Sequence, residues 1–363
     1  MVGVFKSEVF YKSERLCVGL NKPIESFRDG YIFITFDGLP GGFSLSGFGT
    51  EFLAKNGYIS LHVTCEKNTS YQYVSSDEII YALSDYIENK TVFLYGSSVG
   101  GYAALYFSSD LKGTAISFSP LCPPDPVLDG AFKSGSEQPF FHTCLIKKNN
   151  SYSTGQFIVY DPLIKYDSLY FNKRVDKGFP NANVYMVPNG QHSVAKTLLN
   201  NGCLKDFFFS IVNNFCFPTG IEIDTLKNSV SFGKKALNLI REGDCEGAYK
   251  IIKKYGGYGV SRYSETALRR LFFDKEYNFT SYELDITKYR KNLHFRSEVV
   301  RSALPSVAFE NSCFFIDLAS VFIYVFDFDA ARSVIFLGLA FYPSDENLNN
   351  MLAKVEEFIS RVK

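Results

Sequence analysis

Residues 96–100 read Gly-Ser-Ser-Val-Gly, so Ser98 stands between two glycines in the spacing Gly-x-Ser-x-Gly. An apolar run precedes the motif at 92–95, and three small residues follow it within 101–104, where a helix is predicted to start. A serine in a tight strand-to-helix turn presents its hydroxyl to a substrate, and only small neighbours allow such a strained turn. The positive end of the helix favours an anionic intermediate. The motif predicts Ser98 as the nucleophile of acyl transfer; the alternative is a glycine-rich turn with a structural serine.

A serine nucleophile needs a general base, and the chain has four histidines. His192 follows the predicted strand Val184–Val187 through a short loop, and α/β sheets place their sites in loops at the carboxyl ends of strands. His62 lies in the middle of a predicted strand, where a buried structural histidine is expected. His142 falls in an irregular stretch, and His294 in the helical half of the chain. The sequence therefore predicts His192 as the base.

The carboxylate that orients the imidazole is expected between the nucleophile and the base in chain order. Asp161 directly follows the predicted strand Phe157–Tyr160, so we predict Asp161 as the acid. Its alternative role is that of a turn carboxylate before Pro162. Asp167, a little further along the chain, is the competitor. Asp125 and Asp129 follow the preceding strand and are also candidates for the acid. Asp176 is a disfavoured candidate, because no strand precedes it.

Acyl transfer also needs two backbone N–H groups that face the negative charge developing on the carbonyl oxygen. The N–H of Val99, directly after the nucleophile, is predicted to be one of them. The second should come from the loop after the first parallel strand, Asp37 to Gly42. Pro40 has no N–H, so Gly38 or Leu39 is the candidate donor.

Six short apolar runs alternate with predicted helices between residues 31 and 217. Their continuous hydrophobicity is typical of parallel strands that are covered on both faces. Ser75 and Glu78 have the spacing of a capping box at one of the helix starts. The alternation predicts an α/β domain, with residues 1–28 adding two alternating strands as an antiparallel edge. The six runs are Tyr31–Phe36, Ile59–Cys65, Val92–Tyr95, Ala115–Phe118, Phe157–Tyr160 and Val184–Val187.

The strand pattern ends near Pro218, and helical patterns follow. We therefore predict an α/β domain at 1–218 and an all-α domain of helix pairs at 219–363. Residues 342–345 resemble the end of a tetratricopeptide unit, but no clean repeat of about 34 residues is present, and a plain helical bundle is the alternative. Residues 121–155 form a long insertion without periodicity, which is interpreted as a lid or an acceptor loop.

The composition limits the classes of function. The chain has 363 residues, more than one core usually organises, and its 38 basic residues balance 38 acidic ones. Whole-molecule attraction to nucleic acid is therefore not expected. The eight cysteines are scattered, with no CxxC pair and no cluster with histidine, so neither a metal site nor a disulfide framework is predicted. With no visible signal peptide and no apolar stretch long enough to span a membrane, a cytoplasmic protein is expected.

Residues 31–217 resemble the α/β-hydrolase fold, in which the triad follows the order of Ser98, Asp161 and His192. Three segments are further similar to a bacterial subgroup that includes capsule-polysaccharide O-acetyltransferases and a hydrolase-like protein of the accessory secretion system. The segments are Phe48–Gly57, Ser70–Gln72 and Tyr95–Ala104.

This resemblance implies a serine acyltransferase that forms an acyl-enzyme and acetylates a hydroxyl of a capsule or cell-surface polysaccharide. It also implies acetyl-CoA as the acyl donor, with no tightly bound cofactor. A carbohydrate or small-molecule acyl esterase is one alternative, and a non-catalytic glycan-binding or secretion-accessory module is another. The helical domain is expected to bind the polymeric acceptor or a protein partner, because repeat-like helix pairs commonly present a concave surface.

Overall fold

The computed structural model divides the chain into two compact units, residues 1–223 and 224–363, each of which is described by itself. The boundary falls a few residues beyond the predicted position at 218. The structure describes residues 4–25, 28–39, 41–128, 140–142, 145, 155–258, 261, 263, 264, 267, 312–324 and 328–362. Most of the predicted insertion at 121–155, including Lys147 and Lys148, lies outside these residues.

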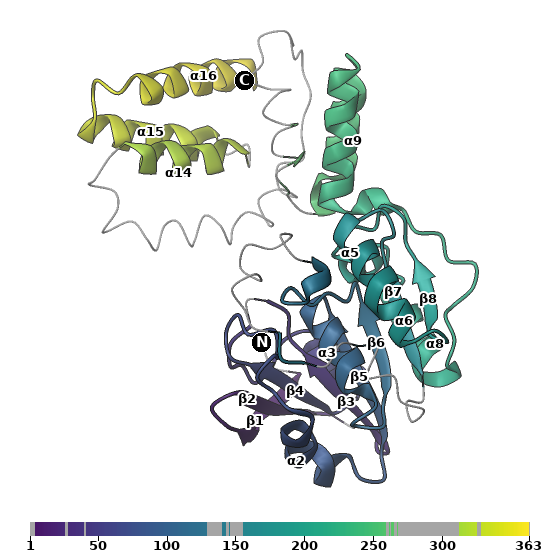
Figure 1. Cartoon of the computed structure of the whole chain (residues 1–363). Coiled ribbons are helices and arrows are strands. Elements are labelled where there is room, and N and C mark those ends of the chain that lie inside the picture. Colours follow the sequence, from purple (N-terminus) through teal and green to yellow (C-terminus); the bar gives the residue numbers. More distant parts are fainter. Residues whose placement is uncertain are drawn as a thin grey trace. The chain divides into compact units, whose positions relative to one another are not determined.

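An eight-stranded sheet forms the centre of the first unit, with the strand order β1-β2-β4-β3-β5-β6-β7-β8 (Figure 1). Strands β3 to β8 are parallel, while β1 and β2 are antiparallel, as predicted. This sheet is consistent with the α/β-hydrolase fold. The strands are β1 (Phe5–Lys12), β2 (Leu16–Pro23), β3 (Tyr31–Phe36), β4 (Ser60–Cys65), β5 (Thr91–Ser97), β6 (Thr114–Phe118), β7 (Gln156–Tyr160) and β8 (Asn183–Met186).

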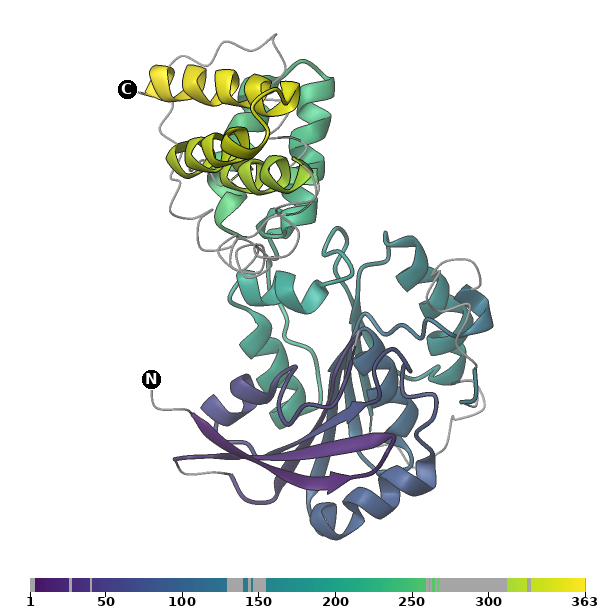
Figure 2. The same ribbon diagram turned by 90° about the vertical axis from the view of Figure 1, so that its left-hand side faces the viewer.

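Helices cover both faces of the sheet (Figure 2). The side chains of Ile34 and Phe36 on β3 join the core beneath α2 (Ser76–Ile87) and α3 (Val99–Ser108). Phe33, on the same strand, points to the opposite face and lies 5.2 Å from the ring of Phe208 on α8 (Leu204–Asn214). The latter face is also covered by α1 (Thr50–Lys55) and α7 (Val194–Asn200). Burial on both faces explains why the parallel strands read as continuous apolar runs.

The strand order reverses between β3 and β5, because β4 lies on one side of β3 and β5 on the other. Phe36 at the end of β3 pairs with Gly96 near the end of β5. Ligands of open α/β sheets bind at the carboxyl ends of the strands at such a switch point. The Gly-x-Ser-x-Gly motif therefore lies where this architecture places its sites.

The second predicted strand of the N-terminal edge is not alternating, contrary to the prediction. Residues Leu16 to Asn21 on β2 are all buried, because β2 lies between β1 and β4 and its surface is covered. The loop at Leu45 packs directly on the backbone of Gly19: a Cβ on Gly19 would lie 2.1 Å from the Leu45 carbonyl oxygen. Of these two strands, β1 is the one that lies at the edge of the sheet.

Among the described residues, four further short helical segments connect strands of the first unit. They follow β6 and β7, and one of them is a turn of π-helix. They are η1 (Pro126–Leu128), α5 (Lys165–Tyr170), the π-helical η2 (Phe171–Val175) and α6 (Asp176–Gly178).

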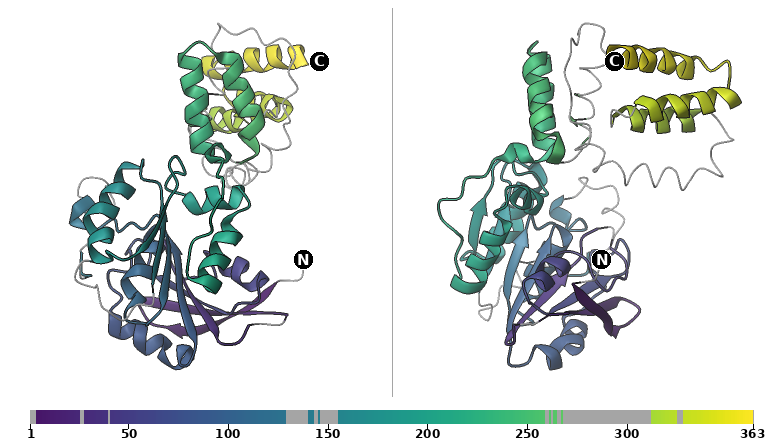
Figure 3. Two further views of the ribbon diagram at one scale, coloured as in Figure 1. Left: turned by 90° about the vertical axis from the view of Figure 1, so that its right-hand side faces the viewer. Right: turned by 180° about the vertical axis from the view of Figure 1, so that it is seen from behind.

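The elements that the structure describes in the second unit are helices (Figure 3). α9 (Ser229–Arg241) packs on α10 (Cys245–Tyr255), and α14 (Cys313–Tyr324), α15 (Phe328–Phe341) and α16 (Glu346–Val362) form a second apolar cluster. Two short 3-10 turns, η3 (Thr225–Lys227) and η4 (Gly256–Tyr258), flank α9 and α10. Asp244 caps α10 by accepting the Gly247 N–H at 2.8 Å. The tetratricopeptide-like arrangement stays a prediction, since residues 268–311 lie outside the described residues.

Within the part of the chain that the structure describes, no helix combines the length and apolarity that crossing a membrane requires.

Candidate active site

Ser98 occupies the turn between β5 and α3, with backbone angles φ 56° and ψ −121°. A residue other than glycine rarely adopts a positive φ, and such strain is concentrated at functional sites. The turn requires both flanking glycines: a Cβ on Gly96 would lie 2.2 Å from Gly100 O, and one on Gly100 would lie 2.3 Å from Phe36 O. The two glycines of the motif are therefore also the residues that the close packing of this turn requires.

His192 connects Ser98 to a buried carboxylate. Its Nε2 lies 2.9 Å from Ser98 Oγ, and its Nδ1 lies 2.8 Å and 3.0 Å from the two carboxylate oxygens of Asp167. Because an ionised carboxylate only accepts hydrogen bonds, Nδ1 carries the proton and Nε2 is free to accept from the Ser98 hydroxyl. Asp167 on α5 is 3% exposed, whereas the His192 side chain is 41% exposed. This is the geometry of a nucleophile, a base and an orienting acid.

The predicted pairing of Asp161 with the imidazole is wrong, and Asp167, the competitor, holds that position. The carboxylate of Asp161 is fully buried and accepts three backbone N–H groups instead. Leu163 and Asn189 donate to Oδ1 at 2.9 Å and 3.1 Å, and Gln191 donates to Oδ2 at 2.8 Å. The bond to Leu163, two residues on, is the turn-carboxylate role that the sequence also allowed.

Asp161 nevertheless acts on the site through the loop that carries the base. Asn189 and Gln191, both bonded to Asp161, have φ values of 64° and 65°. His192 directly follows this strained loop. A buried carboxylate that satisfies the N–H groups of two residues in unfavourable conformations holds the loop, and with it the imidazole, in place.

Asp161→Asn is expected to lower the free energy of unfolding by about 2–4 kcal/mol, because a side-chain NH₂ then faces a backbone N–H that loses its acceptor. The variant should keep a substantial part of its activity, since Asp167 still orients the base. Thermal unfolding and the rate of reaction with a fluorophosphonate probe measure the two effects. A fully stable Asp161→Asn protein that is inactive would restore Asp161 as the acid.

Two other histidines are engaged elsewhere in the first unit. His62 is buried on β4 with Nδ1 2.8 Å from Thr35 Oγ1, and burial lowers its pKa to about 4. His142 has Nδ1 2.7 Å from the Tyr102 hydroxyl and Nε2 2.8 Å from the Val74 carbonyl. Neither lies at the hydroxyl of the predicted nucleophile, and both have the structural character that the sequence suggested for His62.

The remaining candidate carboxylates do not meet the base either. Asp125 forms a bidentate ion pair with Arg174, with contacts of 2.8–3.0 Å. Asp176 is exposed on α6. Asp129 and His294 lie outside the described residues. Among the residues that the structure does describe, no group of three or more His, Cys, Asp or Glu side chains is arranged to hold a metal ion.

The peptide between Ser98 and Val99 is oriented for anion binding. The Ser98 carbonyl accepts from Tyr102 N at 2.9 Å and from Leu121 N at 3.2 Å. The C=O and N–H of a trans peptide point in opposite directions, so the Val99 N–H points out of the N-terminus of α3. This orientation, together with the helix dipole, suits the predicted oxyanion donor.

The loop after β3 reaches the same turn. A Cβ on Gly38 would lie 3.8 Å from the Ser97 carbonyl oxygen and, apart from the adjoining residues of the chain, would contact no other described atom within 4 Å. Leu39, the other candidate donor, is 41% exposed. Pro40 lies outside the described residues. Gly38 therefore borders the nucleophile turn and has open space beside it.

Comparisons with known sequences give no match, either to a protein-family model or to a curated protein. Solved structures that are similar over about half of this chain include enzymes with different reactions. The capsule O-acetyltransferase of Neisseria meningitidis serogroup A is 14% identical with a TM-score of 0.38, covering 56% of this chain and 94% of that one. Est1E from Butyrivibrio proteoclasticus is 15% identical with a TM-score of 0.41, covering 57% and 99%. Acetyl xylan esterase 1 from Thermoanaerobacterium sp. JW/SL YS485 is 11% identical with a TM-score of 0.33, covering 51% and 79%.

Proposed function

We propose that the chain is an enzyme of serine-dependent acyl transfer that works through an ester on Ser98. The observation that carries the proposal is the hydrogen-bonded series Asp167–His192–Ser98, with heavy-atom distances of 2.8 Å and 2.9 Å, beside a strained turn. His192 Nε2 takes the hydroxyl proton as Ser98 Oγ attacks the acyl carbon, and Asp167 stabilises the imidazolium. The imidazolium then gives this proton to the leaving group, and the acyl group stays on Ser98.

Val99 N–H and an N–H of the loop at Gly38 or Leu39 are proposed to stabilise the oxyanion of each tetrahedral intermediate. The Val99 N–H is directed out of the helix by the bonds that its peptide carbonyl makes. A donor at this place contributes only when charge develops on the substrate oxygen, so its effect falls on kcat.

The acceptor of the acyl group is proposed to be a hydroxyl of a capsule or cell-surface polysaccharide, with acetyl-CoA as the donor and its thiol as the first leaving group. His192 takes the proton of the acceptor hydroxyl, whose oxygen attacks the acyl carbon, and Ser98 Oγ leaves with the proton from His192. The resemblance of Phe48–Gly57 and Tyr95–Ala104 to capsule-polysaccharide O-acetyltransferases supports this substrate class. The helical unit is proposed to bind the polymer or a protein partner.

Ester hydrolysis is the second candidate, and the exposure of the base favours it. The His192 side chain is 41% exposed, so water reaches the acyl-enzyme unless a bound acceptor excludes it. Water would then replace the sugar hydroxyl in the same second step.

Incubation with acetyl-CoA or p-nitrophenyl acetate, with and without bacterial polysaccharides, separates the two candidates. Transfer predicts O-acetyl groups on the glycan by mass spectrometry and NMR, and a matching decrease in free acetate. Release of acetate at the same rate with every acceptor, and no acetylated glycan, would identify an esterase. Failure to cleave any acyl donor would contradict both candidates.

A further inference from the structure

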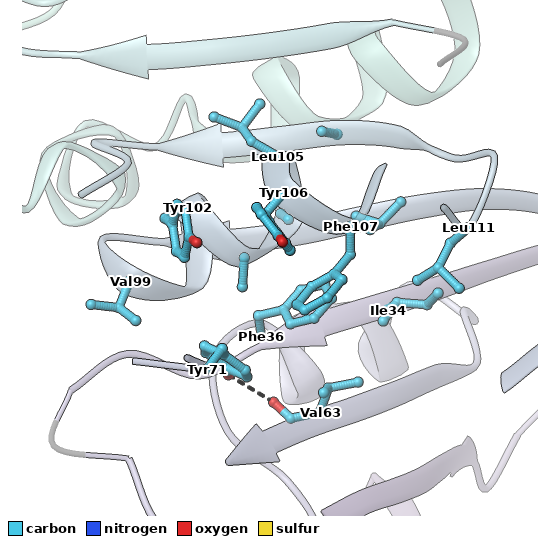
Figure 4. Close-up of a cluster of buried hydrophobic side chains, with 14 of the residues drawn as sticks. Ile34, Phe36, Val63, Tyr71, Val99, Tyr102, Leu105, Tyr106, Phe107 and Leu111 are labelled. Carbon is cyan, nitrogen blue, oxygen red and sulfur yellow. Dashed lines mark hydrogen bonds between the residues drawn. The ribbon is translucent and has the colours of Figure 1, made fainter. Parts of the chain in front are cut away.

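Tyr71 is held in an unfavourable backbone conformation next to the loop after β3. Three residues of the segment between β4 and α2 have positive φ: Asn68 at 61°, Ser70 at 50° and Tyr71 at 61°. A bulky residue in this region is a genuine outlier, and such strain persists only where the surroundings enforce it. The conformation directs the tyrosine ring into the core, where it is 1% exposed and lies edge-on to Phe36 at 5.7 Å (Figure 4).

The Tyr71 hydroxyl links the backbones of two neighbouring parallel strands, β4 and β3. It donates to the Val63 carbonyl on β4 at 3.0 Å, the bond drawn in Figure 4, and to the Asp37 carbonyl directly after β3 at 3.1 Å. Its single proton is shared between these two carbonyls. Burial raises the pKa of this hydroxyl well above its ordinary value, so it stays protonated and remains a donor.

The Asp37 carbonyl belongs to the same peptide unit as the Gly38 N–H. Because the two groups of a trans peptide point in opposite directions, fixing the carbonyl fixes the N–H. The carbonyl faces the interior: it meets Tyr71, and a Cβ on Gly100 would lie 3.0 Å from it. The Gly38 N–H therefore points away from Tyr71. Gly38 itself borders the nucleophile turn, since a Cβ on it would lie 3.8 Å from the Ser97 carbonyl oxygen.

We propose that Tyr71 is a positioning residue, which holds the Asp37–Gly38 peptide so that the Gly38 N–H is the second oxyanion donor. The proposal rests on the acyl-transfer function above and deepens it, since it selects Gly38 over Leu39. Tyr71 acts through a backbone amide that forms its bond in the transition state, and the substrate in its ground state gains little from it.

Tyr71→Phe removes only the hydroxyl and is expected to lower kcat by about 10- to 100-fold, somewhat less than the loss of a whole oxyanion donor. KM for p-nitrophenyl acetate should stay within about twofold, because ground-state binding is not affected. Rates are expressed per active site titrated with a fluorophosphonate, so that partial unfolding does not count. Tyr58→Phe, which alters an equally buried tyrosine on the opposite face of the sheet, is the matched control and should keep the wild-type kcat.

An unchanged kcat per titrated site in Tyr71→Phe would overturn the positioning role. So would an increase in KM that accounts for the whole loss, because a misplaced amide affects the transition state rather than substrate binding.

A second measurement uses the unaltered chain and does not depend on how the variant folds. Protein labelled with ¹⁵N-glycine is phosphonylated at Ser98, and the Gly38 amide is assigned from its absence in the spectrum of Gly38→Ala. The phosphonyl oxygen mimics the oxyanion, so the Gly38 amide proton should shift downfield on adduct formation. An adduct that leaves this resonance unmoved contradicts the assignment of Gly38 alone. Absence of any adduct on the wild-type chain contradicts the proposed function itself, and with it this inference.

Discussion

Ser98→Ala is expected to lower the turnover of a p-nitrophenyl ester by on the order of 10⁵- to 10⁶-fold, and to abolish covalent labelling by a fluorophosphonate. The alanine has no oxygen to attack the acyl carbon, and His192, which lies 2.9 Å from that oxygen, then has no nucleophile to activate. Any residual rate would come from the oxyanion donors acting on water. Initial rates at substrate saturation and gel detection of the probe measure the two losses.

Ser97→Ala is the matched control for this prediction. Ser97 is the last residue of β5 and directly precedes the nucleophile, so its substitution tests any local disturbance of the turn. Labelling and turnover should both persist, because the hydroxyl that faces His192 remains. Labelling of Ser98→Ala at the wild-type level, or its loss in Ser97→Ala only, would show that the wrong serine has been assigned.

Asp167→Asn is expected to lower kcat by about 10⁴-fold, the effect of the corresponding change in a well-studied serine protease. The carboxylate accepts the Nδ1–H of His192 at 2.8 Å, and this bond leaves Nε2 unprotonated toward Ser98. An asparagine that presents its NH₂ to Nδ1 stabilises the opposite tautomer, in which Nε2 carries the proton and accepts nothing. Steady-state kinetics measure the change, and the melting temperature should fall much less than in Asp161→Asn.

The two carboxylate variants form a reciprocal pair. Asp167→Asn should lose activity while remaining folded, and Asp161→Asn should lose stability while retaining a substantial part of its activity. The opposite pattern would mean that the acid directly after β7 orients the base in solution, and that the Asp167 contact is not the catalytic one.

Much of the first unit could be predicted from the sequence, because its signals are local. Parallel strands covered on both faces need continuous apolar runs, and each of the six runs coincides with one of the strands β3 to β8, with at most one residue outside it. The burial of β2 could not be predicted in this way. It depends on the loop at Leu45, which packs on the backbone of Gly19 and is far from it in sequence.

The site shows the same division between local and distant information. Ser98 and its two glycines are recognisable because the strain of one turn dictates their types. The choice between Asp161 and Asp167 depends on which of the two carboxylates accepts the backbone N–H groups of the loop before His192. Asp161 accepts them from Asn189 and Gln191, which are 28 and 30 positions away in the sequence. A signal was nevertheless present: a carboxylate directly before Pro162 is typical of a turn, where it bonds to the backbone.

Tyr71 is the residue that sequence reasoning missed. It lies in Ser70–Gln72, a segment noted only for its resemblance to a bacterial subgroup, and nothing in the sequence there indicates that its hydroxyl reaches Asp37, 34 positions earlier in the chain. Only the fold shows that Tyr71 and two residues close before it have positive φ, and that its proton is shared by carbonyls of β4 and of the residue after β3.

The most direct test of the central claim is the mass of the protein shortly after rapid mixing with p-nitrophenyl acetate. We expect a burst of p-nitrophenol close to one equivalent, a protein heavier by one acetyl group, and a peptide map that places this group on Ser98. The ester should decay when an acceptor hydroxyl or water is supplied. Release of p-nitrophenol from the wild-type chain with no acetyl group on Ser98, or with the group on another residue, would contradict the central claim.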